Sequence, residues 1–257
     1  MGRKLLEIAY LGTNYCGWQV QPNGITVQEV LQNSLLKLLK HRPDVTGCSR
    51  TDSGVHAKSF FCHFDTAVNI PNDGLVLGLN TVLPEDIAAI NCYDVPDSFH
   101  ARYSSTGKLY RYSFLCSKIK NPFLAGRTFL LKNSINMSLA KEYCNLLIGK
   151  HNFEAFSSIN RTVKDTVRTV YDCHIETNDN NIDFLVKADG FLYNMVRIMV
   201  GTLLEFSAGK ITSDDIKEAF ETGERTLLGI TAPPQGLYLE KVFYDNDLKL
   251  FGNGREV

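Results

Sequence analysis

The order of the strands and helices predicted along the chain indicates an α+β fold made of two similar halves. Alternating polar and apolar residues mark strands, whereas apolar residues three or four positions apart mark helices. The pattern runs strand, helix, strand, helix, strand, and a similar series starts near Pro96. We therefore expect two mostly antiparallel sheets, each with helices on one side. The join is predicted at about residues 96–107, which divides the chain into residues 1–100 and 101–257.

The first half is predicted to hold three strands and two helices. The strands are expected over residues 4–12, 59–66 and 87–95, and the helices over residues 26–40 and 73–83. The first helix has the clearest signals, because Thr26 and Glu29 have the spacing of a capping box and its leucines and valines form one apolar face.

The second half is predicted to repeat the pattern, with four strands and three helices. Strands are expected over residues 109–116 and 236–244, and as a pair within residues 169–189 joined by a polar Asn/Asp turn. Helices are expected over residues 137–149, 190–206 and 212–223. Gly149 is the predicted stop of the first of these helices.

The composition is that of a soluble globular protein. Of the 257 residues, 44% are hydrophobic and 21% are charged, and no apolar run is long enough to cross a bilayer. The start resembles neither a signal peptide nor a myristoylation signal. The seven cysteines are odd in number and lack metal-ligand spacing, a pattern that favours reduced thiols in the cytoplasm without a structural metal.

The charges are unevenly distributed although the formal net charge is only −1. Residues 98–141 contain no Asp or Glu, but they contain eight Lys or Arg and seven Phe or Tyr. One interpretation is a strand-rich segment with a basic outer face. The other is a surface that contacts phosphates and unstacked bases of a nucleic acid.

A second feature is the sequence GCSRTDSGVHA at residues 47–57. Asp-Ser-Gly is common in plain surface turns, because Asp caps its own backbone and Gly accepts a positive φ. A plain turn does not explain the neighbouring Arg50, Thr51 and His56, however. A carboxylate on a glycine-flanked loop is also a suitable nucleophile or general base, which makes Asp52 a candidate catalytic residue.

Two further candidates come from the second half. Arg197 is the only charged residue between Asp189 and Glu205, and it has no acidic residue three or four positions away, so a partner must come from elsewhere in the fold. Gly201 follows one turn later and leaves space for something to approach. In KLYRYSF, Tyr110 and Tyr112 are expected on one face of a strand, where they either pack or contact a base.

These motifs occur in the order found in one family. The chain has YLGTNYCGWQVQ, TVQE, RTDSGVHA, FHARYSSTGKLYRY, FEAFSS, FLYNMVRIMVGTLLE and APPQGLYLEKVFY, which together span most of its length. In this set the chain resembles the tRNA pseudouridine synthases of the TruA family. The resemblance implies the pseudouridine synthase fold, in which two pseudo-symmetric halves join their sheets into a mixed central sheet with a cleft between them.

The resemblance also implies roles for four residues. Asp52 matches the catalytic aspartate, and Tyr110 matches the tyrosine that stacks on the target uracil and is placed to accept the C5 proton. Arg197 matches the arginine that pairs with the aspartate and is expected to keep it ionised. Arg50 matches the arginine implicated in flipping the nucleotide. His56 has no such role and is expected to be structural.

The implied reaction converts uridine to pseudouridine at positions 38, 39 or 40 of the tRNA anticodon arm. It is an isomerisation, so we expect no redox cofactor, nucleotide or metal. The implied partners are tRNA and a second copy of the chain in a homodimer. The chain departs from the family pattern at Leu11 and Ser49, which leaves open a paralogue with another RNA target.

Three other classes of protein remain as alternatives. A non-catalytic RNA-binding protein would have the basic segment but would not need the Asp52–Arg197 pair. A glycoside hydrolase would need a second carboxylate beside Asp52, and no motif supplies one. A thiol enzyme would use Cys48 and His56.

Overall fold

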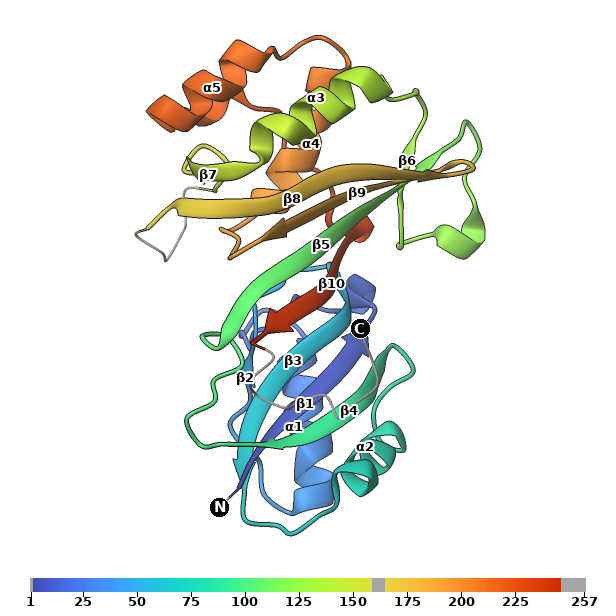
Figure 1. The fold of residues 1–257 in the computed structure, drawn as a ribbon. Coiled ribbons are helices and arrows are strands. Elements are labelled where there is room, and N and C mark those ends of the chain that lie inside the picture. Colours follow the sequence, from blue (N-terminus) through green and yellow to red (C-terminus); the bar gives the residue numbers. More distant parts are fainter. Residues whose placement is uncertain (1, 159–164, 246–257) are drawn as a thin grey trace. The chain divides into compact units, whose positions relative to one another are not determined.

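The structure is a computed structural model and describes residues 2–158 and 165–245. The chain forms two compact units (Figure 1). The first unit comprises residues 2–106 and 239–245, and the second comprises residues 107–238. The last strand thus returns to the unit formed by the start of the chain. Each unit is an α+β structure, which confirms the predicted fold class.

The first unit is built on an antiparallel sheet with β1 between β3 and β4. Its strands are β1 (Gly2–Tyr10), β2 (Thr46–Gly47), β3 (His56–Thr66), β4 (Ile87–Val95) and the part of β10 (Leu237–Tyr244) from residue 239 onward. β2 pairs with β3, and β10 lies beside β3 on the opposite side from β1. In the register, Leu6 lies opposite both Cys62 and Cys92, in the buried centre of the sheet.

Two helices belong to this unit, α1 (Val27–Leu39) and α2 (Asn72–Asn80). Val27, Leu31 and Leu35 are fully buried, as expected for one apolar helix face. The side chain of Thr26 accepts a hydrogen bond from the backbone N–H of Glu29, which is the Thr26 half of the predicted capping box. The sequence therefore predicted the start of α1 correctly.

The second unit contains a mixed sheet with the strand order β5-β9-β8-β7. Its strands are β5 (Ser105–Cys116, from residue 107 onward in this unit), β6 (Phe129–Leu131), β7 (Gly149–Asn152), β8 (Val167–Asn178) and β9 (Asn181–Ala188). The β5–β9, β9–β8 and β8–β7 pairs are antiparallel, whereas β6 pairs in parallel with β5. Helices α3 (Met137–Leu147), α4 (Met195–Ser207) and α5 (Ser213–Thr222) lie on the same side of this sheet (Figure 1).

Some predicted boundaries were wrong for local physical reasons. The helix expected from residue 190 begins only at Met195, because Asn194 has a left-handed backbone with φ +61°. The helix expected to end at Gly149 ends at Leu147, and Gly149, with φ +116°, begins β7. The strands β2, β6 and β7 were not predicted, because two to four residues are too few to show alternation.

The part of the chain that the structure describes contains no helix long and apolar enough to cross a membrane. Among the same residues, no group of three or more His, Cys, Asp or Glu side chains is arranged to hold a metal ion. Among the described residues, none of the seven cysteines takes part in a disulfide bond.

Candidate active site

The loop that carries Asp52 joins β2 to β3 in the first unit. The backbone N–H of Val55 donates to the carbonyl of Asp52 at 3.2 Å, and Gly54 has φ +79°. These are features of a type II β-turn, with Gly54 at the position that requires a positive φ. The turn interpretation is therefore correct for the backbone, and it leaves the half-buried Asp52 side chain at the first position of the turn.

The backbone of this loop is held by the segment that follows β1. The N–H of Trp18 donates to the carbonyl of Thr51 at 3.2 Å, and the N–H of Gly54 donates to the carbonyl of Tyr15 at 3.2 Å. The hydroxyl of Ser53 donates to the same Tyr15 oxygen. The chain is thus fixed on both sides of Asp52 by main-chain groups more than thirty positions earlier in the sequence.

Two glycines make this close packing of segments feasible. A Cβ atom on Gly12 would lie 1.9 Å from the carbonyl oxygen of Val55, and one on Gly17 would lie 2.4 Å from the carbonyl oxygen of Thr51. Gly17 also has φ +81°, a backbone conformation that other residues rarely adopt. The glycines of YLGTNYCGW are therefore required by the approach of the Asp52 loop.

His56, at the start of β3, also holds the loop against the segment that follows β1. Its Nδ1 atom accepts a hydrogen bond from the backbone N–H of Gly12 at 2.9 Å, and the side chain is fully buried. An accepting Nδ1 carries no proton, so the imidazole is neutral. Its role is structural. The thiol-enzyme alternative loses support as well, because Cys48 is also fully buried.

Arg197 lies in the first turn of α4 in the second unit. Its Nε donates to the carbonyl of Ala232 at 2.8 Å, and one terminal nitrogen donates to Oδ1 of Asn194 at 2.8 Å. The N–H of Ala232 in turn donates to the carbonyl of Arg197 at 3.0 Å. Asn194 is itself held by a hydrogen bond to Ser158 at 2.8 Å. The guanidinium is thus oriented by two fixed acceptors.

The space beside Gly201 on α4 is filled by the backbone of residues 229–232. A Cβ atom there would lie 1.6 Å from the carbonyl oxygen of Ile230. The N–H of Gly229 donates to the hydroxyl of Thr202 at 3.1 Å, and a Cβ on Gly229 would also collide with the backbone of α4. Residues 229–232 therefore lie directly on α4, which places the Ala232 carbonyl within reach of Arg197.

Tyr110 and Tyr112 are both buried on β5, but the structure gives them different surroundings. The hydroxyl of Tyr112 donates to the carbonyl of Pro233 at 2.8 Å, and burial raises the pKa of Tyr112. The ring of Tyr110 meets the ring of Phe191 edge-on, with 4.9 Å between centroids. Tyr112 thus holds the chain at Pro233 through its hydroxyl, so Tyr110 is the better candidate for a contact with substrate.

The acid-free segment at residues 98–141 is not a uniform basic stripe. On β5, Lys108 is buried, and Arg111 contacts Asp183 at 3.3 Å and the ring of Tyr238. The exposed basic groups lie instead outside the strand. Lys118 and Lys120 are exposed in residues 117–124, together with the largely exposed Ile119 and Phe123.

The four predicted site residues lie in different units. The first unit holds Arg50, which is exposed, and Asp52 on one loop, and the second unit holds Tyr110 and Arg197. The pairing of Asp52 with Arg197 and the cleft between the halves stay predictions. Sequence reasoning missed Asn194 and the Ala232 carbonyl as partners of Arg197. An Asn directly before an apolar helix was an available signal for the former.

Comparisons with known proteins agree with these motifs. Residues 8–104 and 143–245 match the family described as tRNA pseudouridine synthase. A relative from Clostridium perfringens, "tRNA pseudouridine synthase A 2", is 46% identical over 239 residues, which cover 93% of this chain and 98% of the relative. "tRNA pseudouridine synthase A" from Thermoanaerobacter sp. is 44% identical over 244 residues, 95% of this chain and 100% of the relative.

A solved Cbf5–Nop10–Gar1 complex also matches, over 94% of this chain and 50% of that chain, with a TM-score of 0.37 and 13% identity. The family match and the relatives define the class of protein as an RNA pseudouridine synthase, which is an isomerase. Within that class, the chain belongs to the tRNA pseudouridine synthase family.

Proposed function

We propose that this protein isomerises uridines at positions 38, 39 or 40 of the tRNA anticodon stem-loop, with Asp52 as the catalytic residue. The observation that carries the proposal is the Asp52 loop. Its backbone is locked by Gly12, Gly17 and the Tyr15 carbonyl, yet its carboxylate side chain stays half-buried. A family member that holds the backbone at one carboxylate so firmly is equipped for chemistry at a single placed residue.

The reaction breaks the C1′–N1 bond of uridine, rotates the base and forms a C1′–C5 bond. The carboxylate of Asp52 either attacks the nucleotide covalently or promotes loss of the base at the ribose. The C5 proton must then leave, and the Tyr110 side chain is proposed to stack on the uracil and accept it. The carboxylate is released from any covalent adduct, and N1 gains one proton for the one lost from C5. Uridine and pseudouridine thus have the same composition, so no oxidant, reductant or group donor is needed.

Arg197 is proposed to act on the charge of Asp52, and Arg50 is proposed to act on the position of the target nucleotide. Arg197, oriented by Ala232 and Asn194, is proposed to face the Asp52 carboxylate and keep it ionised. Arg50 is exposed two residues before Asp52, which suits a side chain that enters the space left by a flipped nucleotide. Flipping costs a few kcal/mol, which stacking and phosphate contacts offset.

The proposed partners are tRNA and a second copy of the chain, in the cytoplasm. Exposed Lys118 and Lys120 are proposed to contact tRNA phosphates, because exposed cations next to exposed apolar groups suit a nucleic-acid surface. A chain of net charge −1 has a weak attractive field of its own, so a homodimer that presents this segment twice would bind tRNA better.

Tritium release from tRNA transcripts labelled at uridine C5 tests this function. Three transcripts, each with one of U38, U39 and U40 replaced by cytidine, would show which positions release tritium. We expect release from at least one of these positions and from no other. Binding of tRNA without release would favour the non-catalytic RNA-binding alternative, and release from another position would favour the paralogue.

A further inference from the structure

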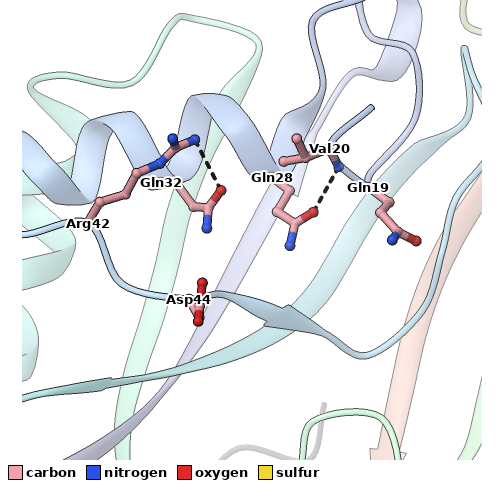
Figure 2. A pocket seen from close by; sticks show the side chains of 6 residues that line it. All are labelled: Gln19, Val20, Gln28, Gln32, Arg42 and Asp44. Carbon is pink, nitrogen blue, oxygen red and sulfur yellow. Dashed lines mark hydrogen bonds between the residues drawn. The ribbon is translucent and has the colours of Figure 1, made fainter. Parts of the chain in front are cut away.

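A polar hollow of about 390 Å³ lies on the first unit, outside the residues described above (Figure 2). Its six lining residues are Gln19, Val20, Gln28, Gln32, Arg42 and Asp44. Figure 2 shows Asp44 across the hollow from the two glutamines of α1, with Arg42 and Gln19 toward its two ends. The volume lies within the range of small-molecule sites, but the lining is mainly amide and charged groups.

Two of these side chains are rigid parts of the wall. Gln28 accepts from the N–H of Val20 at 2.9 Å and donates to the carbonyl of Val45 at 2.7 Å. Gln32 is buried, donates to the carbonyl of Pro43 at 3.1 Å and accepts from Arg42 at 3.3 Å. The hollow therefore keeps its shape without a ligand.

The other polar groups have hydrogen-bonding capacity to spare. Within residues 2–158 and 165–245, the side chains of Gln19 and Asp44 make no hydrogen bond or ion pair, and Arg42 contacts only Gln32. A carboxylate and a guanidinium thus line one hollow without pairing with each other. Such a site presents strong acceptors and strong donors to the same ligand.

We propose that this hollow binds a guanine base. Guanine alone among the four RNA bases has a ring N–H beside an exocyclic amino group, and these two donors match the two oxygens of a carboxylate such as Asp44. Its O6 and N7 acceptors match the donors of Arg42. Adenine and cytosine place a ring acceptor beside their amino group and would be repelled by Asp44, whereas uracil lacks the amino group.

The hollow is joined to the Asp52 loop through a short stretch of chain. Gln19 directly follows Trp18, whose N–H donates to the carbonyl of Thr51, and the N–H of Gln28 donates to the carbonyl of Trp18 at 3.0 Å. A ligand here would contact the segment that fixes the catalytic loop. The guanine comes either from a free nucleotide or from an unpaired residue of the RNA, and the RNA source rests on the proposed function.

The direct test is a titration of ¹⁵N-labelled protein with guanosine monophosphate, followed on the side-chain amide signals of the glutamines. We expect Gln19, Gln28 and Gln32 signals to shift, with a dissociation constant on the order of 1 mM. The other three mononucleotides should give much smaller shifts at the same concentrations. Equal shifts with uridine monophosphate, or none with guanosine monophosphate, would overturn the proposal.

Asp44→Asn and its matched control Asp73→Asn identify the carboxylate involved. Both residues are exposed acids of the same unit, so each variant removes one surface charge without disturbing the core. Asp44→Asn should weaken guanosine monophosphate binding about tenfold or more, because an NH2 donor replaces one of the two acceptor oxygens and faces a guanine N–H, whereas Asp73→Asn should leave it unchanged. Equal affinities of the two variants would contradict the assignment.

The two sources are separated by the KM for tRNA. Loss of an acidic group should tighten RNA binding slightly through weaker phosphate repulsion, as expected for Asp73→Asn. If an RNA guanine occupies the hollow, Asp44→Asn instead raises the KM for tRNA severalfold and leaves kcat unchanged. If a free nucleotide occupies the hollow, the KM of Asp44→Asn for tRNA changes only as much as that of Asp73→Asn. The titration itself requires no turnover, so failure of the proposed function would leave its result intact.

Discussion

The loop that carries Asp52 and the start of α4 that carries Arg197 are both held by close backbone contacts, but they are held in different ways. In the first unit the loop is held by the main chain of Tyr15 and Trp18, by the hydroxyl contact of Tyr10 with Thr51, and by His56. In the second unit the functional side chain is itself a structural element, since Arg197 binds Ala232 and Asn194.

We therefore expect replacement of Asp52 to affect mainly activity, and replacement of Arg197 to affect both activity and stability. Replacement of the Asp52 side chain leaves the main-chain hydrogen bonds at Thr51 and Gly54 in place. Replacement of Arg197 removes two hydrogen bonds to a charged donor, each worth about 1.5–3 kcal/mol at most. Variants at the two positions should therefore differ in stability even where both lose activity.

The largest effect is expected for Asp52→Asn. The amide can neither attack nor accept a proton, so pseudouridine formation should fall by about a thousandfold or more. The melting temperature and tRNA affinity should stay close to wild type, because the loop is held by its backbone. Tritium release, a thermal melt and a filter-binding titration measure the three quantities. Turnover within about tenfold of wild type would exclude Asp52 as the catalytic residue.

Glycine variants test how rigidly each region is packed. Gly201→Ala places a methyl group against the Ile230 carbonyl and should cost about 3 kcal/mol or more of unfolding free energy. Gly209→Ala is the matched control, because Gly209 has φ +70° but nothing within 4 Å of an added Cβ. It should cost about 1 kcal/mol of backbone strain. Similar costs in urea denaturation would show that the 229–232 segment is displaced easily.

Arg197→Met should lower both stability and activity. Loss of the two hydrogen bonds should cost about 3 kcal/mol of unfolding free energy. If Arg197 faces Asp52, loss of the positive charge lets the carboxylate bind a proton more readily, so activity should fall most at low pH. The measurement is the ratio of variant to wild-type rate between about pH 8 and about pH 5.

Arg197→Lys is the control that separates the two effects. It keeps a positive charge but loses the planar guanidinium that reaches Ala232 and Asn194 together. The lysine variant should therefore be destabilised while its pH profile stays close to wild type. A flat rate ratio for Arg197→Met across the same pH range would refute the proposed pairing with Asp52.

The support of the first unit by neutral histidines predicts a pH effect on its stability. Burial, helped by the nearby charges of Arg3 and His100, lowers the pKa of His63 to about 4 from 6.5, and its Nδ1 accepts from the N–H of Ala101 at 3.1 Å. Between these two values the unfolded chain binds a proton that the folded chain does not. Stability should therefore fall as pH falls through this window, by up to about 3 kcal/mol.

His63→Gln checks the source of this slope, since Gln can accept a hydrogen bond but does not titrate. The variant should have an unfolding free energy that depends less on pH between 6.5 and 4. Urea denaturation at several pH values gives both slopes. An unchanged slope would assign the pH dependence to other groups.

The sequence predicted those parts of the molecule that depend on local pattern. The start of α1 followed from Thr26 and the apolar repeat, and the turn at Gly54 followed from Asp-Ser-Gly. Gly201 was expected to leave space for a close approach, but the sequence did not predict that residues 229–232 would fill it. Contacts such as Trp18 to Thr51 join main-chain atoms of distant segments, and backbone groups are the same in every residue type.

The smallest effect on tRNA modification is expected at the exposed Lys118 and Lys120, which lie in neither of these two regions. These side chains have no structural role in the proposal, so the double variant to Ala should keep wild-type stability. If both contact phosphates, tRNA affinity should fall severalfold and the slope of log affinity against log salt should decrease by about two. Lys241→Ala, a half-buried lysine near the ring of Phe243, is the control and should keep the wild-type slope. An unchanged salt slope in the double variant would move the RNA surface away from residues 117–124.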